Sequence, residues 1–485
     1  MKSIVAAFPI HVLLWLGSNA IGASPDFWDE IPLSPSTTMP QKVEDDYWNG
    51  EFQRVNREVS LAEGTKMVFF GDSITWHWSL GNATGKEVWN GHYANYKPVN
   101  MGNSGDITPV MLYRVTHGNL DFAEGRQPKV AVLLCGTNNF VVTQSNGGKE
   151  KWDLGANCPP ADIANGQRAI AQVFRRRLPG TRVILMAILP VADQVKWAKC
   201  QQVNALNAAV AYNGNEVAYV DLQDKFLLPD GTINRSLFTD GTHLTAEGYK
   251  VWAKSIEPLV ERFMNAPPLR PEKIMLIGDS ITEGLDSTTS YRCYLDGILR
   301  RSGRQIDLIG SRKKHNDDKT EPQSYQYNVD HEGHWGKDSG WMAENLPRLL
   351  TTNVPDVAVI HLGTEDVLSS KIAAETLTDV IVRNINHVIE SLRSKNPNVR
   401  IVLSTVLPPN GKESIIKLLN IKISQCAQSR STPSQPVVLA DPNLGLDDSI
   451  GLTDTGILPN ARGAKRMAEA FAEAIQRLPG GDQNK

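Results

Sequence analysis

The chain has 485 residues, which is too long for one ordinary hydrophobic core, so two domains are expected. Its hydrophobic fraction of 41% and charged fraction of 21% are typical of a soluble globular protein. The net charge of -3 gives no indication of a broad basic surface. Neither nucleic acid nor an anionic membrane surface is therefore an expected partner.

The first residues have the pattern of a secretory signal peptide. Lys2 precedes an apolar stretch from Ile4 to Leu16, and small residues follow at positions 18–23. A membrane anchor would need about 20 apolar residues, and this run is shorter. We therefore expect residues 1–23 to be a signal peptide, the mature protein to be secreted, and no segment to span a membrane.

Secretion would permit disulfide bonds among the five cysteines. Cys135 lies in an apolar run and is predicted to be a buried free thiol. Cys158 and Cys200 both follow segments that leave the carboxyl ends of predicted strands, so a Cys158–Cys200 disulfide is favoured. Pairing of Cys293 with Cys426 stays open, because sequence alone does not decide connectivity.

Strands and helices alternate after an N-terminal extension at residues 24–60, which is rich in Pro, Ser, Asp and Trp. Apolar residues at helical spacing predict a helix over 162–178, and Pro179-Gly180 marks its end. Alternation of this kind predicts a parallel sheet covered by helices on both sides. The predicted strands are Lys66–Phe70, Val130–Leu134, Arg182–Leu189 and Val217–Leu222.

The pattern then starts again after a proline-rich linker at residues 266–272. A period of about 200 residues indicates domain duplication and not a solenoid of short repeats. The first domain is assigned to residues 61–265, the second to 273–479, and a short tail to 480–485. The segments that repeat in the two domains are Lys66–Thr75 with Lys273–Thr282, Val130–Thr137 with Val357–Thr364, and Arg182–Leu185 with Arg400–Leu403.

Four segments of the first copy carry side chains suited to acyl transfer: residues 71–75, 100–106, 136–139 and 238–244. Ser73 follows a buried strand and could act as the nucleophile, with His243 as its base and Asp240 to orient the imidazole. The backbone N–H groups of Ser73 and Gly105, with the Asn138 amide, could bind the oxyanion. Each feature alone has an ordinary structural explanation, such as a helix cap or a turn, whereas the set is harder to explain that way.

These segments resemble those of the SGNH (GDSL-type) hydrolases, a superfamily of esterases and lipases. The resemblance covers residues 61–265 and places the family's hallmark residues at Ser73, Gly105, Asn138 and His243, with Asp240 completing the triad. Within the superfamily, the segments at 100–108, 136–139 and 239–249 are most similar to platelet-activating-factor acetylhydrolase catalytic subunits and microbial acetylesterases. The resemblance implies two flavodoxin-like, three-layer α/β/α domains and neither a metal nor an organic cofactor.

The second copy keeps Ser280 but departs from the pattern elsewhere. Its segment His331–Gly336 resembles that of SGNH carbohydrate esterases, with Gly336 at the oxyanion position. Glu365 stands where an amide donor is needed, and an ionised carboxylate donates no hydrogen bond. Leu458 replaces the histidine. Thr455 stands where the aspartate belongs, with Asp454 beside it.

We therefore expect the second domain to be catalytically inactive. The alternative is a histidine recruited from elsewhere, namely His331, His334 or His361. Trp335 and Trp341 could stack on a sugar, or they could be core residues.

Together these features predict a secreted serine ester hydrolase that removes short acyl groups, such as acetyl, from a glycan or another acylated small molecule. A lipid-directed esterase is the alternative within the same class. A non-catalytic glycan-binding protein is the alternative from another class, and the intact set in the first domain argues against it.

Overall fold

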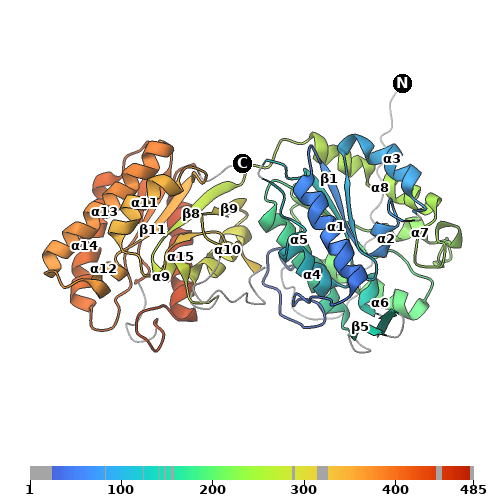
Figure 1. Cartoon of the computed structure of the whole chain (residues 1–485), viewed down its shortest axis with the longest axis horizontal. Coiled ribbons are helices and arrows are strands. Elements are labelled where there is room, and N and C mark those ends of the chain that lie inside the picture. Colours follow the sequence, from blue (N-terminus) through green and yellow to red (C-terminus); the bar gives the residue numbers. More distant parts are fainter. Residues whose placement is uncertain are drawn as a thin grey trace, which may run out of the picture.

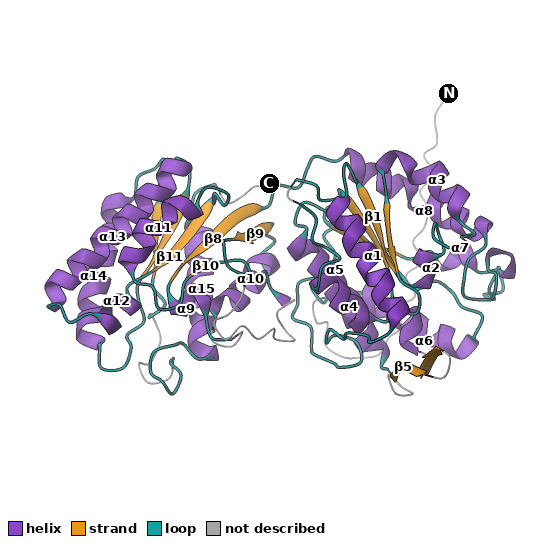
Figure 2. Ribbon diagram, viewed as in Figure 1, coloured by secondary structure: helices purple, strands orange, loops and turns teal. Residues whose placement is uncertain are grey.

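The computed structural model describes residues 24–81, 83–123, 125–140, 143–146, 149–153, 158–286, 290–313, 326–443 and 451–480. The expected signal peptide and residues 481–485 of the tail lie outside this part. Two α/β domains lie side by side, each with a parallel sheet between layers of helices (Figure 1, Figure 2). The prediction of two flavodoxin-like, three-layer domains is confirmed. No helix in the described part is long and apolar enough to cross a membrane.

The first sheet has the order β2-β1-β3-β6-β7, and all its strand pairs are parallel. Its central strands are continuous apolar runs buried on both faces, as expected when helices cover both sides of a parallel sheet. Strand β2 was not predicted, because its four residues include only two large apolar side chains. The strands are β1 Met67–Gly71, β2 Val99–Gly102, β3 Val130–Leu134, β6 Arg182–Met186 and β7 Val217–Val220.

Helices cover both faces of this sheet and form separate hydrophobic clusters there. Helices α1, α4 and α5 pack on the face of Val68 and Phe70, and α3 and α8 pack on the face of Met67 and Phe69. The helices are α2 Ser73–Trp76, α3 Lys86–Tyr93, α4 Thr108–Thr116, α5 Pro160–Arg177, α6 Gln194–Ala208, α7 Gln223–Phe226 and α8 Ala246–Asn265. An antiparallel hairpin joins β4 Thr143–Asn146 to β5 Lys149–Asp153.

The segment assigned as an N-terminal extension contains a 16-residue helix, α1 Asp46–Leu61. Its N-cap is Asp45, whose carboxylate accepts a hydrogen bond from the backbone N–H of Trp48. The helix buries Trp48, Phe52, Val55 and Val59, whose spacing of three and four residues forms one apolar stripe. Through this stripe α1 becomes part of the first domain's helical layer.

The second sheet has the order β10-β8-β11-β12-β13, with β9 also paired to β8. Strands β9 and β10 share one edge of β8, β9 along its start and β10 along its end. The strands are β8 Glu272–Gly278, β9 Ile306–Ile309, β10 Glu332–Gly333, β11 Val357–His361, β12 Arg400–Ser404 and β13 Val437–Ala440. The helices are α9 Ser280–Glu283, α10 Tyr291–Arg301, α11 Ser339–Leu349, α12 Thr364–Ser369, α13 Ala374–Lys395, α14 Glu413–Arg430 and α15 Ala461–Arg477.

The favoured Cys158–Cys200 disulfide does not form. Both residues are buried free thiols in one hydrophobic cluster, but the Cys158 sulfur is directed to the hydroxyl of Ser36, 3.7 Å away. Cys135 is a buried free thiol, as predicted. Cys426 is also free and lies on α14, which packs on the face opposite to α10 with Cys293, so that pair does not form either.

The two domains meet through a buried charged cluster. Asp296 on α10 accepts hydrogen bonds from Arg176 on α5 (3.1 Å) and from Arg300 (3.0 Å). Burial alone would raise the pKa of Asp296, but the two guanidinium groups lower it. Trp28 lies between the same two arginines, with guanidinium carbons 5.0 Å and 4.6 Å from its ring centre. A residue of the N-terminal segment therefore takes part in the contact between the domains.

Candidate active site

The turn Gly71–Thr75 carries Ser73 from the end of β1 into the short helix α2. Gly71 is required by space, because a Cβ there would lie 2.2 Å from the Thr75 hydroxyl and 2.5 Å from the Leu134 carbonyl. Asp72 caps α2 by accepting a hydrogen bond from the N–H of Ile74 at 2.9 Å. Complete burial raises the pKa of the Asp72 carboxyl to about 6. The turn therefore fixes Ser73 at the carboxyl edge of the sheet.

Ser73, His243 and Asp240 form a continuous hydrogen-bonded chain. The Ser73 Oγ lies 2.9 Å from His243 Nε2, and His243 Nδ1 lies 2.7 Å from Asp240 Oδ2. The other Asp240 oxygen accepts from the backbone N–H groups of Thr242 and His243. Desolvation opposes ionisation of Asp240, but these hydrogen bonds prevail and lower its pKa to about 2.

The tautomer of His243 follows from this arrangement. Asp240 is ionised at neutral pH and therefore only accepts hydrogen bonds, so in the neutral imidazole the proton lies on Nδ1. The lone pair on Nε2 then faces the Ser73 hydroxyl, which is the orientation required of a general base.

Gly105 follows β2 and Asn138 follows β3, the two strands that pair with β1. Both strands end beside Gly71, the last residue of β1. Gly105 has a φ of 80°, in the left-handed region that favours glycine. Asn138 is buried, and its side-chain N–H donates to the Asp106 carbonyl at 3.1 Å. One amide hydrogen is used in this way, and the second has no acceptor among the described residues, so it can donate to a ligand. The predicted residues of the first domain thus gather at one edge of the sheet.

Sequence reasoning did not identify His77, which lies beside the triad. Its ring meets that of His243 edge-to-face, with centroids 5.1 Å apart. Burial lowers the pKa of His77, and the nearby His243 lowers it further. The sequence did contain a signal for His77, namely its spacing from Ser73. A residue four positions after Ser73 lies one helical turn further along and therefore on the same side of the helix.

In the second domain the corresponding serine has a different partner. The Ser280 hydroxyl donates to the Glu365 carboxylate at 2.6 Å. The three histidines considered as substitutes have other environments: His331 accepts from the N–H of Gly333, His334 pairs with Glu332, and His361 is buried.

The loop before α8 in the first domain and the loop before α15 in the second contain the same backbone hydrogen bond, which allows them to be aligned. The N–H of Thr239 donates to the carbonyl of His243, and the N–H of Thr453 donates to the carbonyl of Leu458, both at 2.8 Å. Leu458 therefore occupies the histidine position, and its side chain is buried in the core. The second loop is one residue longer. The carbonyls of Gly241 and Gly456 accept from the N–H groups of Ala192 and Asn410, which lie at corresponding places after β6 and β12. Thr455, which precedes Gly456, therefore stands in the place of the triad aspartate, as predicted, and Asp454 is the inserted residue.

The two tryptophans of the second domain differ in environment. Trp335 is 36% exposed, so it is not a core residue. Trp341 packs partly against the core, beside the ring of His334 at 4.6 Å. Among the described residues, no group of three or more His, Cys, Asp or Glu side chains could hold a metal ion.

Comparison with known proteins assigns the chain to a family. The model of the GDSL-like lipase/acylhydrolase family matches twice, over residues 69–251 and 276–466. The chain therefore belongs to the GDSL-like lipase/acylhydrolase family, and it carries the family's domain in tandem.

Individual relatives are similar to about half of the chain. Platelet-activating factor acetylhydrolase IB subunit alpha1 of Homo sapiens is 26% identical over 50% of this chain and 98% of its own length. Subunit alpha2 of Rattus norvegicus is 28% identical, over 47% and 89%. The solved structure of a carbohydrate esterase family 3 protein from Talaromyces cellulolyticus is 27% identical over 42% of this chain and 97% of that one, with a TM-score of 0.38. With its family and its acetylhydrolase relatives, the chain is a carboxylic ester hydrolase.

Proposed function

We propose that the first domain is the hydrolytic one and that it removes short acyl groups, above all acetyl, from carbohydrates outside the cell. The observation that carries the hydrolytic assignment is the hydrogen-bonded chain from Ser73 through His243 to Asp240. Its order is the one that acyl transfer through a serine nucleophile requires.

In the proposed mechanism, Ser73 Oγ attacks the ester carbonyl while His243 Nε2 takes its proton. The oxyanion forms near the backbone N–H groups of Ser73 and Gly105 and the free amide hydrogen of Asn138. As the tetrahedral intermediate collapses, the imidazolium returns the proton to the leaving alcohol, and an acyl-enzyme remains. His243 then activates water, which releases the carboxylic acid and restores the Ser73 hydroxyl. Asp240 stays ionised throughout and stabilises the imidazolium.

The carbohydrate preference rests on three arguments. The N-terminus has the pattern of a secreted protein, the second domain carries a segment resembling those of carbohydrate esterases, and the triad is open to solvent. The Asp240 side chain is 55% exposed and that of His243 is 30% exposed. An acyl group on a bulky, soluble carrier can reach such a site without a long apolar channel. Processing of residues 1–23 would be detected as a shortened N-terminus in culture medium.

A lipid ester is the second candidate substrate. It is favoured by the curated relatives, which are acetylhydrolases of platelet-activating factor. Both candidates have an acetyl group in common, so the difference lies in the alcohol to which it is attached.

The second domain is proposed to be inactive, because Ser280 donates its hydrogen to Glu365 and Leu458 stands at the histidine position. A Ser280 whose hydroxyl is held by a carboxylate, without an imidazole base, lacks the activation that a serine nucleophile needs.

The test is turnover of p-nitrophenyl acetate by the whole protein and by Ser73→Ala and Ser280→Ala variants. We expect Ser73→Ala to abolish turnover and Ser280→Ala to leave it within twofold of wild type. Acetate release from acetylated xylan, pectin and chitin oligosaccharides, set beside short-chain phospholipids, then identifies the alcohol. An inactive wild type, or an active Ser73→Ala, would refute the hydrolytic assignment. A comparable loss in Ser280→Ala would refute the inactive second domain.

A further inference from the structure

Asp106 connects three segments of the first domain next to the candidate oxyanion site. It directly follows Gly105 in the chain and is fully buried. Its carboxylate accepts hydrogen bonds from the indole N–H of Trp48 at 2.9 Å and from the guanidinium of Arg114. Its backbone carbonyl accepts from the side-chain amide of Asn138. One residue therefore joins α1, α4 and the loop after β3.

Two of the proposed oxyanion donors depend on where Asp106 lies. The N–H of Gly105 is adjacent in the chain, and the Asn138 amide is oriented by its bond to the Asp106 carbonyl. If Asp106 moved, the two donors would no longer point to the same place. Preorganised donors contribute to catalysis because they need no rearrangement as the negative charge develops.

Helix α1 holds Asp106 from outside the family's matched segment, which begins at residue 69. Trp48 is completely buried and stacks on Phe52, with ring centres 5.2 Å apart and planes 9° from parallel. Its backbone N–H is held by the cap residue Asp45. The indole is thus fixed by packing and by the helix start before it reaches Asp106.

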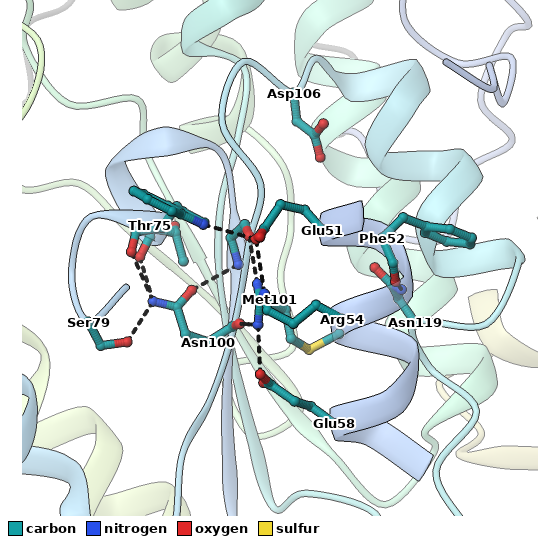
Figure 3. Close-up of polar contacts among 12 residues, drawn as sticks. Glu51, Phe52, Arg54, Glu58, Thr75, Ser79, Asn100, Met101, Asp106 and Asn119 are labelled. Carbon is teal, nitrogen blue, oxygen red and sulfur yellow. Dashed lines mark hydrogen bonds and ion pairs between the residues drawn. The ribbon is translucent and has the colours of Figure 1, made fainter. Parts of the chain in front are cut away.

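Helix α1 also contacts strand β2 and the short helix α2, which begins at Ser73 (Figure 3). Glu51 accepts from the indole N–H of Trp76 at 2.9 Å, and Arg54 donates to the carbonyls of Asn100 and Gly102. Because α2 and the end of β2 are both tied to α1, the helix holds the nucleophile side and the oxyanion side of the site in one frame.

We propose that Trp48 is a positioning residue for ester hydrolysis: its indole N–H, acting through Asp106, holds the Gly105 and Asn138 donors in place. The proposal rests on the proposed function of the first domain and adds to it a residue from the N-terminal segment. The bonds it invokes act on the transition state and not on substrate binding, so kcat should change while KM does not.

The test compares Trp48→Phe with Trp252→Phe in the full chain. Phenylalanine retains an aromatic ring in each buried site and removes the indole N–H. Trp252 is a matched control, because it is completely buried on α8 and its indole N–H has no hydrogen-bond partner among the described residues. Both variants lose similar volume, but only Trp48→Phe loses a hydrogen bond to Asp106.

For Trp48→Phe we expect kcat for p-nitrophenyl acetate to fall roughly 10-fold, less than the 10²–10³ of a deleted donor, with KM within twofold of wild type. For Trp252→Phe we expect kcat within twofold. Rates are referred to the folded fraction of each variant, measured by thermal unfolding, so loss of stability is separated from loss of positioning.

Equal losses of kcat in the two variants, or an unchanged kcat in Trp48→Phe, would overturn this inference and leave the proposed function intact. A rise in KM with unchanged kcat would overturn it as well. A wild-type protein without esterase activity would instead refute the proposed function, and this inference with it.

Discussion

The two domains carry the same five-residue turn, Gly-Asp-Ser-Ile-Thr, yet among the residues that the structure describes only the first domain's serine faces a histidine. In each domain a Cβ on the glycine would collide with the threonine hydroxyl, at 2.2 Å for Gly71 and 2.1 Å for Gly278. In each domain the aspartate caps the following helix, and the isoleucine is buried. Three of the five residues, the glycine, the aspartate and the isoleucine, are therefore explained by the fold alone.

The difference between the domains lies in the partner of the serine hydroxyl. His243 faces Ser73 in the first domain, and Glu365 accepts from Ser280 in the second. The turn thus marks the fold and places a serine, whereas the loops that follow the other strands decide what the serine can do. Exchanging those loop residues between the domains tests this conclusion.

The largest effect is expected for His243→Leu, which gives the first domain the residue of the second. Without a base, turnover of p-nitrophenyl acetate should fall by roughly 10⁴- to 10⁶-fold. The reverse change, Leu458→His, should add no activity to a Ser73→Ala protein, since Ser280 still donates to Glu365. If Leu458→His alone produced activity, the hydrogen bond from Ser280 to Glu365 would not be what prevents Ser280 from acting as a nucleophile.

Asp240→Asn should reduce kcat by about 10⁴-fold, because the asparagine amide can donate to Nδ1 and favour the wrong imidazole tautomer. The control Asp454→Asn, next to the corresponding Thr455 of the second domain, should leave activity unchanged. Steady-state rates of both variants measure this. A loss below tenfold in Asp240→Asn would mean that the tautomer of His243 is held by another group.

Asn138→Glu copies Glu365 into the first domain and should lower kcat by roughly 10²- to 10³-fold. The change removes an amide donor and places a carboxylate where the oxyanion would form. The control is Glu365→Asn, which should add no turnover in the Ser73→Ala background, because Leu458 still provides no base. Retention of more than a tenth of the activity by Asn138→Glu would exclude Asn138 from the oxyanion site.

The smallest effect concerns stability and the buried capping aspartates. Burial raises the pKa of Asp72 to about 6 and that of Asp279 to about 7, where nearby Glu365 and Asp366 raise it further. The folded state therefore holds these protons at pH values where the unfolded chain has released them. Stability from these groups is present below about pH 4 and is lost as the pH rises toward 6 and 7, respectively.

Asp72→Asn and Asp279→Asn keep the capping oxygen and cannot ionise. Relative to wild type, the Tm of Asp279→Asn should rise between pH 4 and pH 7, and that of Asp72→Asn should rise less and level off near pH 6. Calorimetry at several pH values measures both. A Tm difference that is constant from pH 4 to pH 8 would contradict the raised pKa values.

Much of the frame and the candidate site could be predicted from sequence because the signals are local. Strands such as Val130–Leu134 are unbroken apolar runs, and Ser73, Asn138 and His243 each stand beside a strand end or a recognisable turn. The repeat of these signals in the same order, 207 to 227 residues further along the chain, also revealed the duplication. Such features depend on residues close together in the chain.

What could not be predicted depends on directions in space. The stripe of α1 is visible in the sequence, but nothing in it shows that Trp48 reaches Asp106, which lies 58 residues further along. Likewise, placing Cys158 and Cys200 on one edge of the sheet did not reveal that the Cys158 sulfur turns toward Ser36. The one-residue insertion at Asp454 became visible through the backbone hydrogen bonds that align Thr453 with Thr239 and Gly456 with Gly241.

The contact between Trp28, Arg176, Arg300 and Asp296 has a consequence for how the protein can be divided. Removal of the second domain would leave Arg176 without its buried carboxylate and expose one face of Trp28 to water. Loss of this buried ion pair lowers stability, and an uncovered indole favours association with other molecules. A duplicated gene need not yield two separable modules, and the first domain expressed alone should be less soluble and melt at a lower temperature than the intact tandem.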